Sequence, residues 1–170
     1  KYPGWRDLNA ELKPLILSLS LSEKDFRLKQ KPVMPDANWL DKHQYFPLES
    51  SWHSSDDLYT HEPFMPLAEF IKSIDPIGLN FISMWAKVAS KGNMGSKHKH
   101  RGTVSGIYYV DIGHSEGSQK SGRVNFYFGE DKHTIEPSNG DIVIFPAWVF
   151  HDVEEYHGDG PRINISWNMM

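Results

Sequence analysis

Two histidines lie close together in the basic pentapeptide Lys97-His98-Lys99-His100-Arg101. In an extended segment, side chains two positions apart point to the same side, so His98 and His100 can converge on one point. Imidazole is a suitable ligand for iron, zinc, copper and nickel. The charged neighbours oppose cation binding, so a solvent-exposed basic loop is the alternative for this segment taken alone.

A third histidine, His151, lies within the apolar run FPAWVFHDV at residues 145–153. We expect a histidine in such a run to be partly buried, and a buried neutral imidazole needs a partner for each of its nitrogens. A metal ion is one such partner. A backbone group of the core is the other, and it is favoured when His151 is considered alone.

Arg162 opens the run RINISW at residues 162–167, in which isoleucines alternate with polar residues. If Arg162 points into the interior of a barrel, its guanidinium can bind a carboxylate through two hydrogen bonds. Ser166 shares its face of a regular strand, because both occupy even positions. An arginine on an edge strand that faces solvent is the alternative, and Arg162 alone does not separate the two.

The combination is more specific than its parts. Three imidazoles from His98, His100 and His151 form a facial metal triad, which leaves positions open on octahedral iron for a chelating 2-oxoacid and O₂. Arg162 adds an anchor for the far carboxylate of such a co-substrate.

Helices and then strands must position these residues. Apolar residues recur at helical spacing over residues 8–19, with Pro14 expected in the first turn or at a kink. A second helix is predicted from Pro66 to Ile74, ending before Asp75-Pro76. An irregular polar and aromatic stretch at about 25–63 separates them.

The rest of the chain has the texture of short strands with turn residues between them, which predicts a sandwich, barrel or jelly roll. We expect one domain over residues 1–170, with a helical and irregular N-terminal layer at 1–76 and a β-rich core at 77–170. The expected strands are 79–88, 104–112, 123–128, 141–145, 149–153 and 162–167.

Composition narrows the class of protein. The 170 residues carry a formal net charge of −4, which gives no strong signal for nucleic-acid binding. Cysteine is absent, so disulfides, thiolate metal sites and cysteine nucleophiles are excluded. The first apolar stretch, 15–21, is too short for a membrane span. We therefore expect a soluble cytoplasmic protein, in the host cytoplasm if a phage encodes it.

The chain resembles the 2-oxoglutarate/Fe(II)-dependent oxygenases of bacteria and phages. Their core reads roughly HxHxxxxxSGxYY, then GDxxxFPxxxxH, then RxxxSxN. The matching segments are HKH at 98–100 with SGIYY at 105–109, GD at 140–141 through FP at 145–146 to His151, and RINISWN at 162–168. Leu8-Asn9 with Leu12 and the stretch 52–58 also look similar, so the likeness covers most of the chain.

The resemblance implies a mainly β fold, a double-stranded β-helix of the jelly-roll or cupin type with flanking N-terminal helices. It implies Fe(II) held by His98, His100 and His151, and 2-oxoglutarate held by Arg162 with Ser166 or Tyr108. The implied reaction is a dioxygenation that hydroxylates an unidentified small-molecule or peptidic substrate with O₂ and releases succinate and CO₂.

Two positions depart from this pattern. His100 stands where most members of the wider superfamily carry Asp or Glu, which makes all three ligands neutral and leaves the iron more positive. His100 is therefore either the third ligand or a neighbour of it, with a water or a distant carboxylate as ligand. Arg101 stands where relatives often have proline.

Two other functions fit the sequence. One is a three-histidine cupin-like metalloenzyme that does not use 2-oxoglutarate, and it requires Arg162 to face away from the metal. The other is a non-enzymatic jelly-roll binding or structural module, which predicts that no metal binds. The substrate and the oligomeric state are left open.

Overall fold

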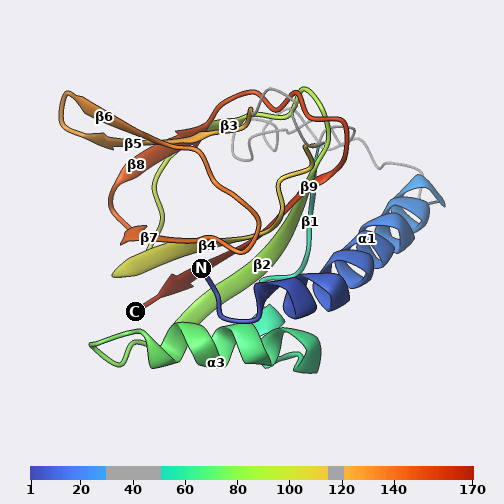
Figure 1. Ribbon diagram of the computed structural model, residues 1–170, viewed down its shortest axis with the longest axis horizontal. Coiled ribbons are helices and arrows are strands. Elements are labelled where there is room, and N and C mark those ends of the chain that lie inside the picture. Colours follow the sequence, from blue (N-terminus) through green and yellow to red (C-terminus); the bar gives the residue numbers. More distant parts are fainter. Residues whose placement is uncertain (30–50, 115–120) are drawn as a thin grey trace, which may run out of the picture.

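The computed structural model describes residues 1–29, 51–114 and 121–170. Within these ranges, two antiparallel sheets face each other, and the helices cover the outer face of the larger one (Figure 1). The larger sheet has the order β1-β2-β9-β4-β7 and the smaller one β3-β8-β5-β6. The strands are β1 (Ser51–His53), β2 (Phe81–Ala89), β3 (Gly95–His98), β4 (Val104–Asp111), β5 (Val124–Phe128), β6 (Asp131–Ile135), β7 (Ile142–Pro146), β8 (Phe150–Val153) and β9 (Arg162–Met169).

The helices lie on one side of the larger sheet. They are α1 (Trp5–Lys29) and α3 (Met65–Ser73), with the short 3₁₀ turns η1 (Leu58–Thr60) and η2 (Glu62–Phe64) before α3. The second predicted helix is confirmed. The first is longer than expected: Pro14 lies inside α1 rather than in its first turn, and the helix continues past the expected start of the irregular stretch. Most of that stretch, 30–50, lies outside the described residues.

The apolar face of the helical layer explains why it docks there. Leu12, Ile16 and Leu67 are fully buried in one cluster with alternate residues of the sheet, among them Ile163 and Ile165. Burial of such side chains contributes about 1.5–3 kcal/mol each. None of the helices in the described part of the chain is both long and apolar enough to cross a membrane.

The sheets confirm the predicted mainly β fold with flanking N-terminal helices. All six predicted strands form, with ends shifted by a few residues. The sequence pattern did not predict strands at β1 and β6, and it indicated only an extended segment at β3. All five residues of β6 are exposed, so it carries no apolar alternation to detect.

Strands β4 and β9 lie at the centre of the larger sheet and present different residues to its two faces. Tyr108, Ile163 and Ile165 belong to the cluster under the helices. Tyr109 and Ile107 belong instead to a second cluster between the two sheets. The space between the sheets is where the candidate site lies.

Candidate metal and co-substrate site

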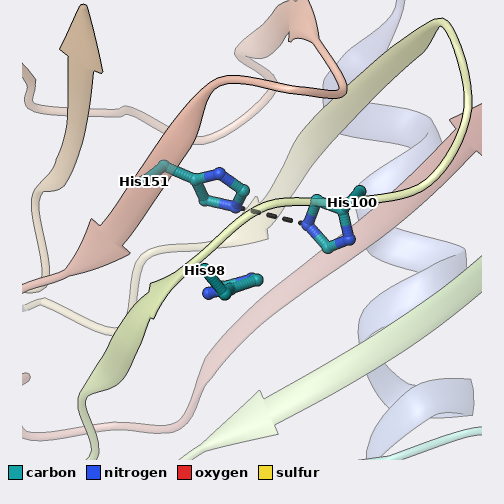
Figure 2. A group of neighbouring side chains, drawn as sticks. All are labelled: His98, His100 and His151. Carbon is teal, nitrogen blue, oxygen red and sulfur yellow. Dashed lines mark hydrogen bonds between the residues drawn. The ribbon is translucent and has the colours of Figure 1, made fainter. Parts of the chain in front are cut away.

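Three histidines converge at the inner edge of the smaller sheet (Figure 2). His98 ends β3 and is paired in register with His151 of β8. His100 lies beyond the end of β3, and its backbone N–H donates to the carbonyl of Ala147 at 2.9 Å. One ligand nitrogen from each ring lies within 4.8 Å of the other two. The chain thus brings together all three predicted metal ligands, with His98 and His151 in strands and His100 just beyond the end of β3.

The ring nitrogens are prepared for a metal. Nδ1 of His98 lies 2.6 Å from the carbonyl oxygen of Ser96, and Nδ1 of His151 lies 3.1 Å from that of Val149. A carbonyl only accepts, so each Nδ1 must carry the proton and each Nε2 keeps its lone pair. Nε2 of His100 lies 3.3 Å from Nε2 of His151, as the dashed line in Figure 2 marks. This donor set fits a divalent transition metal.

The surroundings keep two of the rings neutral. Burial, with the neighbouring histidines, lowers the pKa of His100 to about 4. Burial also lowers the pKa of His151 to about 4, although the bond to the Val149 carbonyl acts the other way. Both imidazoles are therefore unprotonated at pH 7, which is the form that ligates a metal.

The triad opens into a cavity of about 430 Å³ between the two sheets. That volume lies within the range of small-molecule sites. Aromatic rings form much of the wall near the triad: the Phe145 ring centre lies 4.8 Å from that of His151, and the Trp85 ring centre lies 5.8 Å from that of His100. The wall therefore limits water around the triad.

Arg162 faces the same cavity and is 4% exposed. Its Nη2 donates to the carbonyl of Gly122 at 3.1 Å, and in the described part of the chain no carboxylate pairs with it. Its guanidinium carbon lies 5.3 Å from the ring centre of Tyr109. A buried cation without an anionic partner is costly, so this end of the cavity fits a carboxylate ligand.

Tyr109 strengthens that fit. Its hydroxyl is buried, lines the cavity wall with Arg162, and has no hydrogen-bond partner among the described residues. Burial raises the pKa of Tyr109, so the phenol stays protonated and can donate. An orphaned donor beside an unpaired guanidinium is the arrangement that a carboxylate would satisfy.

The other two predicted co-substrate residues differ in position. Ser166 lines the cavity, and its Oγ accepts from Nδ2 of Asn164 at 3.1 Å. Tyr108 does not reach the cavity: its hydroxyl donates to Oδ1 of Asn9 at 2.5 Å on the helical side of the sheet. The expectation that Tyr108 helps to hold 2-oxoglutarate is therefore corrected. Side chains alternate along β4, so Tyr109 faces the cavity instead.

The sequence reading also missed Lys87, which lines the cavity from β2. It lay inside a run predicted as a strand, but nothing in that run showed which face the lysine occupies. A charged residue in an otherwise apolar strand was the available signal.

Comparison with known proteins agrees with this architecture. The fold is similar to that of HygX from Streptomyces hygroscopicus, solved with nickel and 2-oxoglutarate bound (10% identity, TM-score 0.56, covering 88% of this chain and 77% of that chain). It is also similar to a Pseudomonas putida prolyl-4-hydroxylase (18% identity, TM-score 0.54, covering 91% and 85%).

A third similar structure is a prolyl hydroxylase from Trichoplax adhaerens, in complex with a hypoxia inducible factor oxygen degradation domain peptide fragment (14% identity, TM-score 0.55, covering 70% and 62%). The chain spans less than two thirds of that protein. At identities this low, the three structures show a shared double-stranded β-helix fold and nothing more. No curated protein matches the chain.

Family membership rests on the sequence itself. Residues 83–168, half of the 170-residue chain, match the family described as "Putative 2OG-Fe(II) oxygenase". The matched segment runs from β2 to β9 and contains the three histidines, Tyr109 and Arg162. The chain belongs to this family of 2-oxoglutarate- and Fe(II)-dependent oxygenases.

Proposed function

We propose that the protein is a dioxygenase that uses Fe(II), 2-oxoglutarate and O₂ to hydroxylate its substrate, with release of succinate and CO₂. His98, His100 and His151 hold the iron, and Arg162 with Tyr109 and Ser166 holds 2-oxoglutarate. One observation carries the proposal: a three-histidine group shares a cavity with a buried arginine and a buried tyrosine, and no acidic residue in the described ranges pairs with either.

The histidines position the metal through their second nitrogens. The Ser96 and Val149 carbonyls fix the rings of His98 and His151, so Nε2 of each is held toward the centre of the triad. Bound Fe(II) supplies the redox and O₂ chemistry that no side chain can provide.

Arg162 and Tyr109 bind the far carboxylate of the co-substrate. A carboxylate bound there would accept hydrogen bonds from the guanidinium and from the phenol, which would satisfy both groups at once. Ser166 follows on the same strand face and lies opposite Trp85, closer to the triad. The pair at one end and the triad at the other thus fix the direction in which the co-substrate lies.

The apolar wall protects the reaction. Phe145, Ile107 and Trp85 give the cavity apolar walls beside the triad. An apolar wall lowers the local dielectric, which strengthens electrostatic contacts with the co-substrate and limits side reactions of the oxidant.

An anaerobic titration tests the proposal. Fe(II) and then 2-oxoglutarate are added, and the visible charge-transfer band of the chelated 2-oxoacid is recorded. We expect the band in the wild type, its loss in His151→Ala, and a 2-oxoglutarate requirement raised about 30-fold or more in Arg162→Met, because truncating one partner of a buried charge pair costs about 2–5 kcal/mol. Arg123→Met is the matched control, since Arg123 is exposed and binds Glu154 at the surface.

A second function is favoured by one observation: in the described part of the chain the metal group is composed of histidines alone. Three neutral ligands also suit a cupin-like metalloenzyme that does not use 2-oxoglutarate. Iron binding without the band, and with Arg162→Met unchanged, would select that function. Absence of iron binding would leave a non-enzymatic jelly-roll module.

A further inference from the structure

We propose that Lys87 binds an anionic group of the primary substrate, so that the enzyme acts on a small organic anion. The inference rests on the proposed function, because it assumes that Arg162 and Tyr109 are taken by 2-oxoglutarate. It concerns a residue that the metal and the co-substrate do not use.

Lys87 places a cation in the wall of the cavity. It projects from β2 into the wall, is half-buried, and lies opposite His53 of β1 and Asn164 of β9. No hydrogen bond or ion pair joins its ammonium group to any described residue. Burial and the charge of Arg162 lower the pKa of Lys87 to about 8, as expected for an ammonium group that lacks an anion.

The backbone of Lys87 lies two strands from that of Tyr109, and Lys87 is a diagonal neighbour of Arg162 on the adjacent strand. In the sheet, Tyr109 is in register with Asn164, and Asn164 is in register with Lys87 on its other side. Two strand spacings separate the backbones of Tyr109 and Lys87, which is about 10 Å. Asn164 lies between them, so Lys87 and Tyr109 flank the cavity floor from opposite sides.

The charges in the cavity require more than one anion. Lys87 and Arg162 are positive, and bound Fe(II) adds two charges because its three ligands are neutral. The two carboxylates of 2-oxoglutarate offset only half of these four charges. The one carboxylate among the described lining residues, Asp56, is exposed, and its backbone pairs with Met84 further along β2. Positive charge is therefore left over for a second anion.

The position of Lys87 also sets how far the anionic group of the substrate lies from the triad. Trp85 lies two residues before it on the same strand face, a separation of about 7 Å. The ring of Trp85 is the one that lies beside His100. A substrate whose anionic group is on Lys87 therefore places carbon atoms a few bonds away next to the triad. Carboxylate, phosphate and sulfonate share this chemistry.

The alternative role for Lys87 is a second cation on 2-oxoglutarate itself. The two roles differ in what changes the Lys87 ammonium group. If Lys87 binds the co-substrate, 2-oxoglutarate alone raises its pKa. If Lys87 is reserved for the substrate, 2-oxoglutarate on Arg162 removes only the smaller effect of the Arg162 charge, and most of the rise in the Lys87 pKa waits for a second anion.

The experiment uses the whole protein labelled with [¹³C]lysine, loaded with diamagnetic Zn(II) and saturated with 2-oxoglutarate. The Lys87 Cε signal, assigned by its absence from Lys87→Met, is followed between pH 6 and 11 with and without sulfate, a dianion that does not titrate in that range. With 2-oxoglutarate alone we expect the Lys87 pKa to rise only slightly above its value in the ligand-free protein. When sulfate is added we expect a further rise of about one unit or more, equivalent to tenfold tighter sulfate binding to the charged form.

Two outcomes overturn the proposal: a comparable rise with 2-oxoglutarate alone, or no response to sulfate. Calorimetry of 2-oxoglutarate binding to the same Zn(II)-loaded protein, wild type and Arg162→Met, is the separate test of the proposed function. Absent or Arg162-independent binding there refutes the co-substrate site, whereas normal binding with an unresponsive Lys87 refutes only the role of Lys87.

Discussion

Tyr108 and Tyr109 are neighbours on β4, yet their hydroxyl groups have opposite surroundings. On the helical face, Tyr108 donates to Asn9, whose own amide donates to the backbone carbonyl of Val110 at 2.6 Å. On the cavity face, the hydroxyl of Tyr109 is buried without a partner in the described part of the chain. Both faces belong to the same sheet.

The difference separates stability from function. Buried polar groups are normally hydrogen-bonded, because an unsatisfied one costs about 1–3 kcal/mol. Among the described residues the helical face obeys this rule at Tyr108 and Asn9 and departs from it at Nε1 of Trp167. The cavity face breaks it with Arg162, Lys87 and Tyr109, which are arranged for a ligand rather than for one another. Changes on the helical face should therefore alter stability, and changes on the cavity face should alter binding.

The largest effect is expected from removing a metal ligand. His151→Ala should weaken Ni(II) or Fe(II) binding by about 100-fold or more, because loss of even an outer partner of a ligand costs 10–100-fold. Calorimetry under anaerobic conditions measures it. His157→Ala is the matched control, since His157 is exposed and lies beside Glu155. Equal metal affinity in both variants would remove His151 from the site.

Gly106→Ala should disturb the packing of the helical face. A Cβ at Gly106 would lie 2.1 Å from the indole of Trp167, a ring that is 1% exposed and packed in the cluster under the helices. Overpacking of this kind costs about 3 kcal/mol in urea unfolding. Gly78→Ala has open space and meets only the strain of its positive φ, about 1 kcal/mol. Similar losses in the two variants would contradict the packing argument.

Lys87→Met should stabilise the metal-free protein by about 1–3 kcal/mol at pH 7, since it removes an unpaired buried cation. The pKa of Lys87 is about 8 in the folded state and 10.5 in its ordinary state, so between these values the unfolded chain binds more protons. The wild type therefore gains stability as pH rises from 8 to 10.5, and the advantage of the variant fades. Urea unfolding at pH 7 and 10.5 measures this. Lys91→Met, at an exposed position, should show no such trend.

The smallest effects are expected at Tyr108 and Tyr109, and they test directly whether the two faces serve stability and binding. Tyr108→Phe leaves Oδ1 of Asn9 without its donor and should cost about 1–2 kcal/mol of stability, with no change in 2-oxoglutarate affinity. Tyr109→Phe removes an unsatisfied hydroxyl, so stability should hold or rise while 2-oxoglutarate binds about tenfold more weakly. Reversed results would mean that the two faces are assigned wrongly.

Much of the fold was predictable because local pattern and tertiary environment agree. The runs 104–112 and 162–167 are rich in β-forming residues and became the two central strands of the larger sheet. Strand β6 was not predictable, because a strand exposed on every residue forms only through its pairing with β5.

The candidate site divides in the same way. Residue type and spacing alone predicted the candidates for metal and carboxylate chemistry, which are His98, His100, His151 and Arg162. Adjacent residues in a strand must point to opposite faces, so the sequence also implied that Tyr108 and Tyr109 differ.

Three features became known from the tertiary structure alone. Tyr109 rather than Tyr108 reaches the cavity, His100 joins the triad from beyond the end of β3, and Lys87 lies in the same wall. Alternation fixes the relative directions of neighbouring side chains, but the register and the packing of the helices decide which direction is inward. Because both faces of the larger sheet are buried, apolar flanks surround each tyrosine, and hydrophobicity alone could not tell the helical face from the cavity.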